Sequence, residues 1–278
     1  MDKINQARQL IKAAKETFEL RRAAILDKAF RGELTAKWRE DVFVEEQRKL
    51  PKDWVRISLK DILYVNPPKM KLNDVTDDQE CSFIPMQAVC EITGTVKESE
   101  IRKYSEVKNG YTFFLDGDVI FAKITPCMEN GKSTLISGLR NGFGFGSTEF
   151  FVLRAKDPNK INMKLIHYLV RSKSFRLQAK SVMSGAVGQQ RVPKAFIENY
   201  PFNLPPKEEQ DQIVKILDSL FEKEHAVDGY LSKIPEFETL EKAILSKAFR
   251  GELRTNDPSE VSAMSLLIES LNKQLSQA

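Results

Sequence analysis

Three short fragments carry residue types that could do phosphate or methyl-transfer chemistry. Residues 130–133, Asn-Gly-Lys-Ser, look like the end of a phosphate-binding loop, but Pro126 stands where the first glycine of that loop belongs. Residues 66–69, Asn-Pro-Pro-Lys, look like the Asn-Pro-Pro-Tyr motif of amino-methyltransferases, but Lys69 replaces the aromatic ring that stacks on a flipped base. Residues 142–146, Gly-Phe-Gly-Phe-Gly, have no acid at the spacing that a dinucleotide loop needs. These fragments predict no catalytic site.

Histidine and cysteine are scarce, which limits the remaining chemistry. The chain has two histidines, His167 and His225, and three cysteines, Cys81, Cys90 and Cys127, with no Cys-x-x-Cys pair. Because clustered cysteines and histidines are the usual zinc ligands, we expect reduced thiols, no disulfide framework and no metal site. His167 lies beside an apolar stripe, so we interpret it as a core or edge histidine rather than a ligand.

Side chains suited to the edges of nucleic-acid bases occur in several predicted loops. Gln and Asn can bond bidentately to adenine, and Arg or Lys to guanine, so Gln189-Gln190-Arg191 on a glycine-hinged loop is a candidate reader of the major groove. An ordinary surface loop is the alternative. Further candidates that lie in turns or on the same loop are Gln87, Lys123, Thr125, Asn130, Lys132, Ser147, Thr148 and Ser184.

The charge distribution favours a polyanion partner for the middle of the chain. Residues 1–50 carry 12 bases and 9 acids (+3), residues 51–206 carry 22 and 16 (+6), and residues 207–278 carry 9 and 14 (−5). Eight bases and one acid lie between Arg154 and Lys180, where we expect Lys173 and Arg176 to contact phosphates. A solvated face is the other interpretation of such a run.

Hydrophobic periodicity predicts an α+β fold, with one mixed domain flanked by long antiparallel coiled-coil-like helices. Short strands are expected at residues 54–57, 61–65, 82–84, 118–122, 149–153 and 200–204. One amphipathic helix is expected over residues 163–183, with the basic run on its polar side.

An internal repeat brackets this domain. Residues 24–34, AILDKAFRGEL, and residues 243–253, AILSKAFRGEL, agree at ten of eleven positions. The repeat predicts two equivalent surfaces, with Phe30, Arg31, Phe249 and Arg250 as partner contacts. A duplicated helix end without further function is the alternative, because Gly32 and Gly251 fall where a helix C′ glycine would.

Apolar residues at intervals of seven predict the two long helices. Ile4, Ile11, Phe18 and Ile25 define the first seam, and Ile213, Leu220, Val227 and Ile234 the second. The second helix is expected from residue 207 to about residue 250, with an interruption near Pro235. We therefore divide the chain into an N-terminal helix and linker (1–49), a mixed domain (50–206), a long helix (207–253) and a tail with a short helix (254–278).

Composition predicts a soluble, cytoplasmic protein. Hydrophobic residues make up 41% of the chain and charged residues 29%, and no run of 18 apolar residues occurs. The N-terminal segment is a charged helix former rather than a signal sequence, so we expect neither secretion nor membrane spanning.

The combination of features resembles the specificity (S) subunits of type I restriction-modification systems, in a short form with a single target recognition domain. The matching residues are 50–55, 59–62, 117–124, 146–150, 183–190, Ile197, Pro201, 204–206, 209–210, 213–214 and the two Lys-Ala-Phe-Arg-Gly-Glu-Leu copies. The likeness covers nearly all of residues 1–253. The usual pattern has two recognition domains in tandem, and this chain has one.

The resemblance implies a non-catalytic subunit whose recognition domain reads one half of a bipartite double-stranded DNA target. Its helices would act as a spacer and dock methyltransferase (M) subunits and, through them, restriction (R) subunits. S-adenosylmethionine and ATP would be cofactors of those partners only. A chain with one recognition domain should dimerise or be a fragment, and the end repeats favour a homodimer. Two other hypotheses stay open: a DNA adenine methyltransferase that uses residues 66–68, and a structural coiled-coil adaptor.

Overall fold

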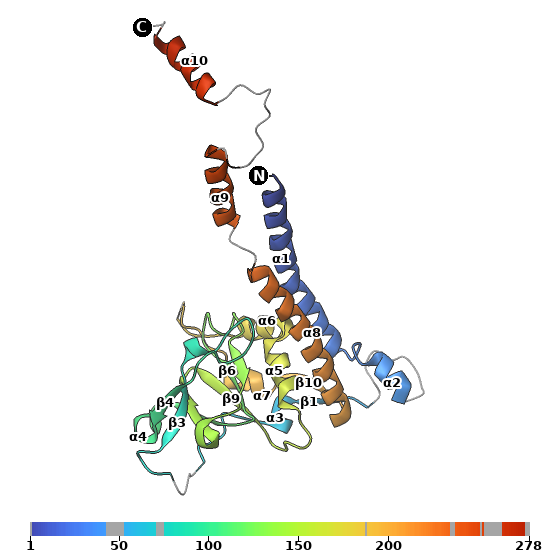
Figure 1. Ribbon diagram of the computed structural model, residues 1–278. Coiled ribbons are helices and arrows are strands. Elements are labelled where there is room, and N and C mark those ends of the chain that lie inside the picture. The colour runs from blue at the N-terminus through green and yellow to red at the C-terminus, as the bar shows by residue number, and fades with distance from the viewer. Residues whose placement is uncertain are drawn as a thin grey trace. The chain divides into compact units, whose positions relative to one another are not determined.

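A computed structural model describes residues 2–42, 53–70, 75–186, 188–233, 237–250, 252 and 263–275 (Figure 1). The chain divides into two compact units. We call Phe18–Lys223 the sheet unit, and Met1–Thr17 with Glu224–Ala278 the helical unit. The sheet unit extends beyond the predicted domain of residues 50–206, because it includes the C-terminal part of the first helix and residues 207–223 of the second. The described residues include no helix long and apolar enough to cross a membrane.

Two four-stranded sheets and one two-stranded sheet form the framework of the sheet unit. Their strand orders are β2-β9-β6-β7, β4-β3-β8-β5 and β1-β10. The strands are β1 (Val55–Ser58), β2 (Leu63–Val65), β3 (Glu80–Ile84), β4 (Glu100–Lys103), β5 (Thr112–Leu115), β6 (Val119–Ala122), β7 (Ser133–Leu135), β8 (Phe143–Gly146), β9 (Phe150–Ala155) and β10 (Pro201–Leu204). All pairs are antiparallel except β3 with β8.

Helices connect and cover these strands or follow them. They are α1 (Asp2–Phe30), α2 (Ala36–Val42), α3 (Leu59–Ile62), α4 (Tyr104–Val107), α5 (Met163–Arg171), α6 (Lys173–Ser181), α7 (Lys194–Glu198), α8 (Lys207–Lys233), α9 (Phe237–Phe249) and α10 (Ala263–Leu275), with 3-10 turns η1 (Met86–Ala88) and η2 (Arg140–Gly142). The mixed α and β architecture that the sequence predicts is confirmed.

Strands β6 and β9 are buried on both faces, which makes them the rigid centre of the sheet unit. Phe121 and Phe151 pack on one face with the α5–α6 side, and their rings stack 5.7 Å apart. Ile120 and Val152 face the other way, into a second cluster shared with the β3 and β5 strands. Alternate residues of a strand point to opposite faces, so these continuous apolar runs serve two cores at once.

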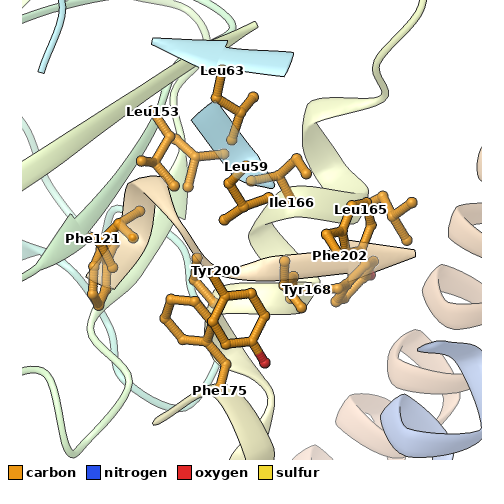
Figure 2. Close-up of a cluster of buried hydrophobic side chains, with 14 of the residues drawn as sticks. Leu59, Leu63, Phe121, Leu153, Leu165, Ile166, Tyr168, Phe175, Tyr200 and Phe202 are labelled. Atoms are coloured by element: carbon orange, nitrogen blue, oxygen red, sulfur yellow. The ribbon is translucent and has the colours of Figure 1, made fainter. Parts of the chain in front are cut away.

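The first of these cores also anchors the long helices. Figure 2 shows Phe202 beside Leu165 of α5, Leu59 beside Ile166, and Phe175 against Tyr200. The same cluster includes Leu26 and Ala29 of α1 and Ile213, Val214 and Leu217 of α8. The C-terminal part of α1 and the N-terminal part of α8 therefore pack on the sheet unit, where they lie side by side and run in opposite directions (Figure 1).

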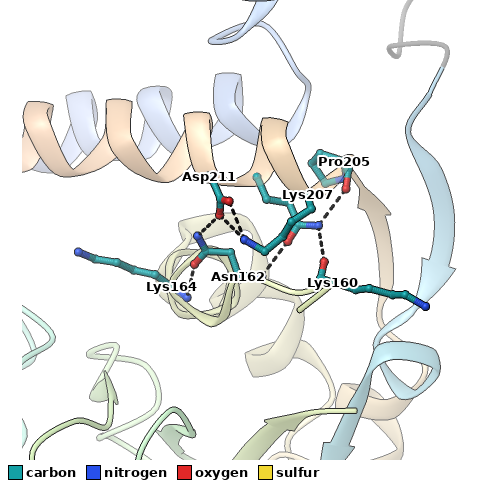
Figure 3. Close-up of polar contacts among 7 residues, drawn as sticks. Lys160, Asn162, Lys164, Pro205, Lys207 and Asp211 are labelled. Atoms are coloured by element: carbon teal, nitrogen blue, oxygen red, sulfur yellow. Dashed lines mark hydrogen bonds and ion pairs between the residues drawn. The ribbon is translucent and has the colours of Figure 1, made fainter. Parts of the chain in front are cut away.

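The first turn of α8 is tied to the start of α5 by polar contacts (Figure 3). Asn162 Nδ2 donates to Asp211 at 2.7 Å, while the Asn162 Oδ1 caps α5 by accepting the Lys164 N–H at 3.0 Å. The Gln210 side chain donates to the carbonyls of Lys160 and Pro205, at 3.0 and 2.9 Å. These bonds set the direction in which α8 leaves the sheet unit.

A buried carboxylate joins α8 to the segment after α1. Glu209 is 3% exposed and accepts hydrogen bonds from Trp54 Nε1 at 2.9 Å and Thr35 Oγ1 at 2.6 Å. Arg39 forms an ion pair with the same carboxylate and also donates to the Gly32 carbonyl. Glu209 therefore joins α8 to two segments that are far from it in sequence.

Several expected elements differ in detail. The helix expected over residues 163–183 is two helices, because Ser172 ends α5 and its Oγ accepts the Phe175 N–H at the start of α6. Residues 61 and 62 belong to α3 rather than to a strand. Residues 143–146, interpreted as a weak likeness to a cofactor loop, form β8. The expected interruption of the second long helix falls between the end of α8 and the start of α9; residues 234–236, with Ile234 and Pro235, lie outside the described residues.

Candidate nucleic-acid interface

Three loops meet at the end of the β6–β9 pair, and we call them together the loop cluster. They are residues 123–132, 147–149 and 184–191, of which residue 187 lies outside the described residues. The backbone N–H groups of Lys123, Thr125 and Val192 donate to the carbonyls of Glu149, Gln190 and Lys123 at 2.9, 3.0 and 2.9 Å. Because β6 and β9 are buried, these loops project from a rigid base.

The structure brings most of the predicted base-reading residues together in the loop cluster. Ser147 and Gln190 are half-buried, whereas Thr148, Ser184 and Gln189 are exposed. Gln190 also donates its backbone N–H to Thr125 Oγ1 at 3.1 Å. The predicted residues within the cluster are Lys123, Thr125, Asn130, Lys132, Ser147, Thr148, Ser184, Gln189, Gln190 and Arg191. Their contact with DNA stays a prediction.

Arg191, one of the predicted base-reading residues, is held by an ion pair with Glu149 and by a bond to its own loop. Its Nε and Nη2 donate to the Glu149 carboxylate at 2.7 to 3.1 Å, and its Nη1 donates to the Gln189 carbonyl at 3.1 Å. The bond to Arg191 lowers the pKa of Glu149, and the same pair raises the pKa of Arg191. Sequence reasoning missed Glu149, and only its position in a turn with Ser147 and Thr148 could have signalled it.

A second group of predicted residues lies along the 123–132 loop and η1. Lys132 Nζ donates to the Met86 carbonyl at 3.3 Å, and Asn130 Nδ2 donates to Glu91 at 3.2 Å. Gln87, in η1, is exposed. These contacts fix the loop against the turn after β3, so Asn130 and Lys132 have a structural role in addition to any role in binding.

The basic run from Arg154 to Lys180 is not a free cationic face. Arg154 forms a buried ion pair with Asp118 at 2.7 Å, and Lys164 pairs with Asp218 at 2.7 Å. Lys180 pairs with Glu129. Acids distant in sequence therefore neutralise three of the eight bases, so the run is not one uninterrupted cationic face.

Two arginines of that run hold loops in place. Arg176 Nη1 donates to the Glu129 carbonyl at 2.6 Å and Nε to the Arg171 carbonyl at 3.2 Å. Arg171 donates in turn to the carbonyls of Glu91 and Ile92, and burial lowers its pKa to about 10. Arg176, predicted to contact phosphate, thus holds the 123–132 loop of the loop cluster in place. Lys173 is exposed at the start of α6.

His167 is a core histidine, as predicted. It is 7% exposed, and a ring nitrogen lies 3.2 Å from the Ser133 carbonyl. Burial lowers its pKa to about 3, so the ring is neutral near pH 7. Among the described residues, no group of three or more His, Cys, Asp or Glu side chains could hold a metal ion.

The fragments that resemble enzyme motifs have structural roles. Asn66 Oδ1 accepts the Val152 N–H at 3.0 Å, and its backbone N–H donates to the Val152 carbonyl at 2.8 Å, so the side chain is used to fix β9. Residues 130–133 form a tight turn into β7, with Ser133 buried, rather than the start of a helix. Neither fragment offers a free group aimed at a substrate.

The two copies of the repeat have the same local geometry and different surroundings. The N–H of Glu33 donates to the Lys28 carbonyl at 2.9 Å, and the N–H of Glu252 donates to the Lys247 carbonyl at 2.9 Å. Both bonds span five residues, and in the first copy this bond closes a Schellman turn at Gly32. Phe30 contacts the Phe202 ring within the sheet unit, whereas Phe249 is 89% exposed. Among the described residues, Phe30 of the first copy is therefore packed, whereas Phe249 of the second copy is exposed.

Comparison with known proteins decides the family. The sequence model of the Type I restriction modification DNA specificity domain matches residues 51–228, which span β1 to α8 and include the whole loop cluster. The chain belongs to this family. The resemblance to type I specificity subunits that the sequence indicated is thereby confirmed at the level of the family.

Relatives within the type I specificity family are longer than this chain. The specificity subunits of the EcoEI and EcoAI enzymes of Escherichia coli are each 42% identical over 170 residues, which are 61% of this chain and 28% of each relative. The EcoKI specificity subunit of E. coli K12 is 25% identical over 255 residues, 87% of this chain and 52% of that protein. The chain thus matches between about a quarter and a half of these relatives.

Solved structures share the fold. The HsdS subunit of Thermoanaerobacter tengcongensis matches with a TM-score of 0.51 and 21% identity, over 91% of this chain and 56% of that one. A chain from a structure concerned with assembly and conformational transition of the type I R-M system matches with a TM-score of 0.53 and 20% identity, over 90% and 58%. At these identities the likeness concerns the fold.

Proposed function

We propose that this chain is a non-catalytic specificity subunit that reads one half of a bipartite double-stranded DNA target. The loop cluster carries the proposal, because it gathers amide, hydroxyl and basic side chains from three loops on a rigid sheet. Loops held by a buried scaffold are suited to recognition, since their side chains lose little freedom on binding. Family membership supports the same role.

The long helices would hold the recognition domain at a fixed distance from its partners. Glu209 and the Asn162–Asp211 contact fix the exit of α8 from the sheet unit, which suits a spacer. In this proposal, M subunits dock on the helices and R subunits join through them. Methyl transfer and ATP-driven steps belong to those subunits, this chain carries no cofactor, and the complex acts in the cytoplasm where its DNA lies.

A homodimer is the second part of the proposal. One sheet unit reads one half-site, so a bipartite target requires a second copy. The exposed second repeat supports this, because Leu245 and Phe249 repeat residues that are packed in the first copy. Two copies related by a two-fold axis would read a palindromic target with a fixed spacer.

The mass of the complex tests the dimer. With the M subunit present, we expect two copies of this chain per complex by analytical ultracentrifugation, and weaker assembly for Phe249→Ser. Leu267→Ser, in α10, is the matched exposed control and should assemble normally. A complex with a single copy, or an unchanged Phe249→Ser complex, would contradict this part.

DNA binding and cofactor binding separate the proposal from its rivals. The chain purified with a neighbouring M subunit should bind one duplex sequence in preference to others in fluorescence anisotropy. Calorimetry with S-adenosylmethionine should show no binding to the chain alone, whereas a methyltransferase acting through residues 66–68 would bind it. The engaged Asn66 side chain argues against that rival. No affinity for any duplex would favour the coiled-coil adaptor, and equal affinity for every duplex would contradict sequence-specific reading.

A further inference from the structure

The exposed pair of Arg191 and Glu149 leaves part of the guanidinium free. Nε shares its N–H between the two Glu149 oxygens at 3.1 and 3.0 Å, and Nη2 donates to Oε1 at 2.7 Å. Nη1 donates to the Gln189 carbonyl at 3.1 Å. A guanidinium has five N–H groups, so one on each terminal nitrogen has no partner within the described part of the chain. Arg191 can hold Glu149 and still offer two donors.

We propose that Arg191 reads a guanine through these two N–H groups and that Glu149 is the positioning residue that holds the guanidinium for this contact. The inference rests on the proposed function and names the base pair that this loop recognises. Guanine presents O6 and N7 together in the major groove, and a bidentate arginine matches both acceptors. The Arg191 side chain is 44% exposed, which leaves it open to such an edge.

The backbone around Arg191 is built to hold this geometry. Ser184 and Arg191 exchange both backbone hydrogen bonds, at 3.1 and 2.8 Å, which closes the loop at its base. Gly185 has φ of 125°, and a Cβ there would lie 2.9 Å from the Gln189 carbonyl oxygen. A glycine is therefore required for the turn that places this carbonyl beside Nη1. A side chain held in advance loses less freedom when it binds.

Electrostatics distinguish this pair from an ordinary phosphate contact. Glu149 offsets the charge of Arg191, and the bond between them lowers the pKa of Glu149, so the carboxylate stays ionised near pH 7. A neutralised pair attracts phosphates weakly and contributes little to the salt dependence of binding. Lys173 is exposed and lies outside the loop cluster. Its loss should therefore reduce the salt dependence of binding and leave the sequence preference unchanged.

Methylation mapping with the assembled complex tests the inference. DNA methylated by the chain with its M subunit would be mapped for the wild type, Arg191→Lys, Glu149→Gln and the control Lys173→Ala. We expect Arg191→Lys and Glu149→Gln to relax the base preference at the same guanine position. Discrimination against other bases there should fall roughly 10- to 100-fold, the range for one bidentate contact. Unchanged discrimination at the other positions would show that both variants are folded. Lys173→Ala should keep the motif and reduce the salt slope of binding.

Three outcomes separate the inference from the proposed function. If the wild type methylates one defined motif and both variants keep every position of it, the inference is wrong and the proposed function stands. If Glu149→Gln alone relaxes a position, Glu149 reads the base itself, which also contradicts the inference. If the wild-type complex methylates no defined motif, the proposed function fails with it.

Discussion

Leu26 and Leu245 hold the same place in two copies of one sequence, yet Leu26 is 6% exposed and Leu245 is 43% exposed. In both copies an equivalent hydrogen bond, between the N–H of Glu33 or Glu252 and the carbonyl five residues earlier, closes the end of the helix. The sequence of the repeat thus determines a helix end, while its surroundings determine whether that helix end is buried.

The repeat supplies a matched pair of substitutions. Leu26→Ala should lower the free energy of unfolding by about 2 to 5 kcal/mol, because it empties part of a core shared by α1, α5 and α8. Leu245→Ala, the same change at an exposed site, should alter it by less than about 0.5 kcal/mol. Urea unfolding of the chain alone measures both. Equal losses would show that the second copy is packed as well.

Glu209 is expected to be essential to the joint between α8 and the sheet unit. Glu209→Gln leaves Arg39 without its carboxylate partner and places an amide N–H against the donors of Thr35 and Trp54. The substitution should lower the free energy of unfolding by roughly 3 kcal/mol. Glu208→Gln, its exposed neighbour on α8, is the control and should be nearly neutral. Urea unfolding compares the two, and similar values for both would remove Glu209 from this role.

His167 should make stability depend on pH. Its folded pKa of about 3 lies below the value of about 6.5 for an unfolded histidine, so the unfolded chain binds more protons between these values. The free energy of unfolding should therefore fall as pH decreases through this window, by roughly 2 kcal/mol from pH 6.5 to 5 for this group.

Substitution isolates the His167 contribution. Unfolding of His167→Gln at several pH values should lack this part of the pH dependence, while the exposed His225→Gln should keep it. An identical pH profile for the wild type and His167→Gln would show that His167 does not titrate in this way.

Much of the fold was predictable where one signal dominates. Apolar runs bounded by turn residues located β1, β3, β6, β9 and β10 within a few residues. The heptad positions Ile4, Ile11 and Ile25 are half-buried and Phe18 is buried, while Leu10 and Leu20, off the seam, are exposed. Here local periodicity and tertiary burial agree.

The strands that were missed depend on contacts between distant segments. Glycines argue against a strand, yet β8 contains two because side chains there would collide. A Cβ on Gly146 would lie 2.5 Å from the Ile84 carbonyl oxygen, and one on Gly144 would lie 2.7 Å from the Phe114 ring. Only the assembled sheet shows why these positions need glycine.

The sequence predicted where the candidate site lies, but it did not predict which side chains of the site pair with one another. A glycine-rich loop with amide side chains indicated residues 184–191, and the structure joins it to residues 123–132 and 147–149. The pairing of Arg191 with Glu149, 42 positions away, and of Arg154 with Asp118 could not be read from composition. Charge counts describe a segment, whereas partners across the fold decide which charges are free.

Methylation with and without this chain is the most direct test of its role. The M subunit would be expressed alone and together with the chain, and the methylated positions in DNA mapped for each. We expect one bipartite motif of two inverted, identical half-sites with a fixed spacer, present only when the chain is included. The same motif from the M subunit alone, or methylation without any shared motif when both are present, would contradict it.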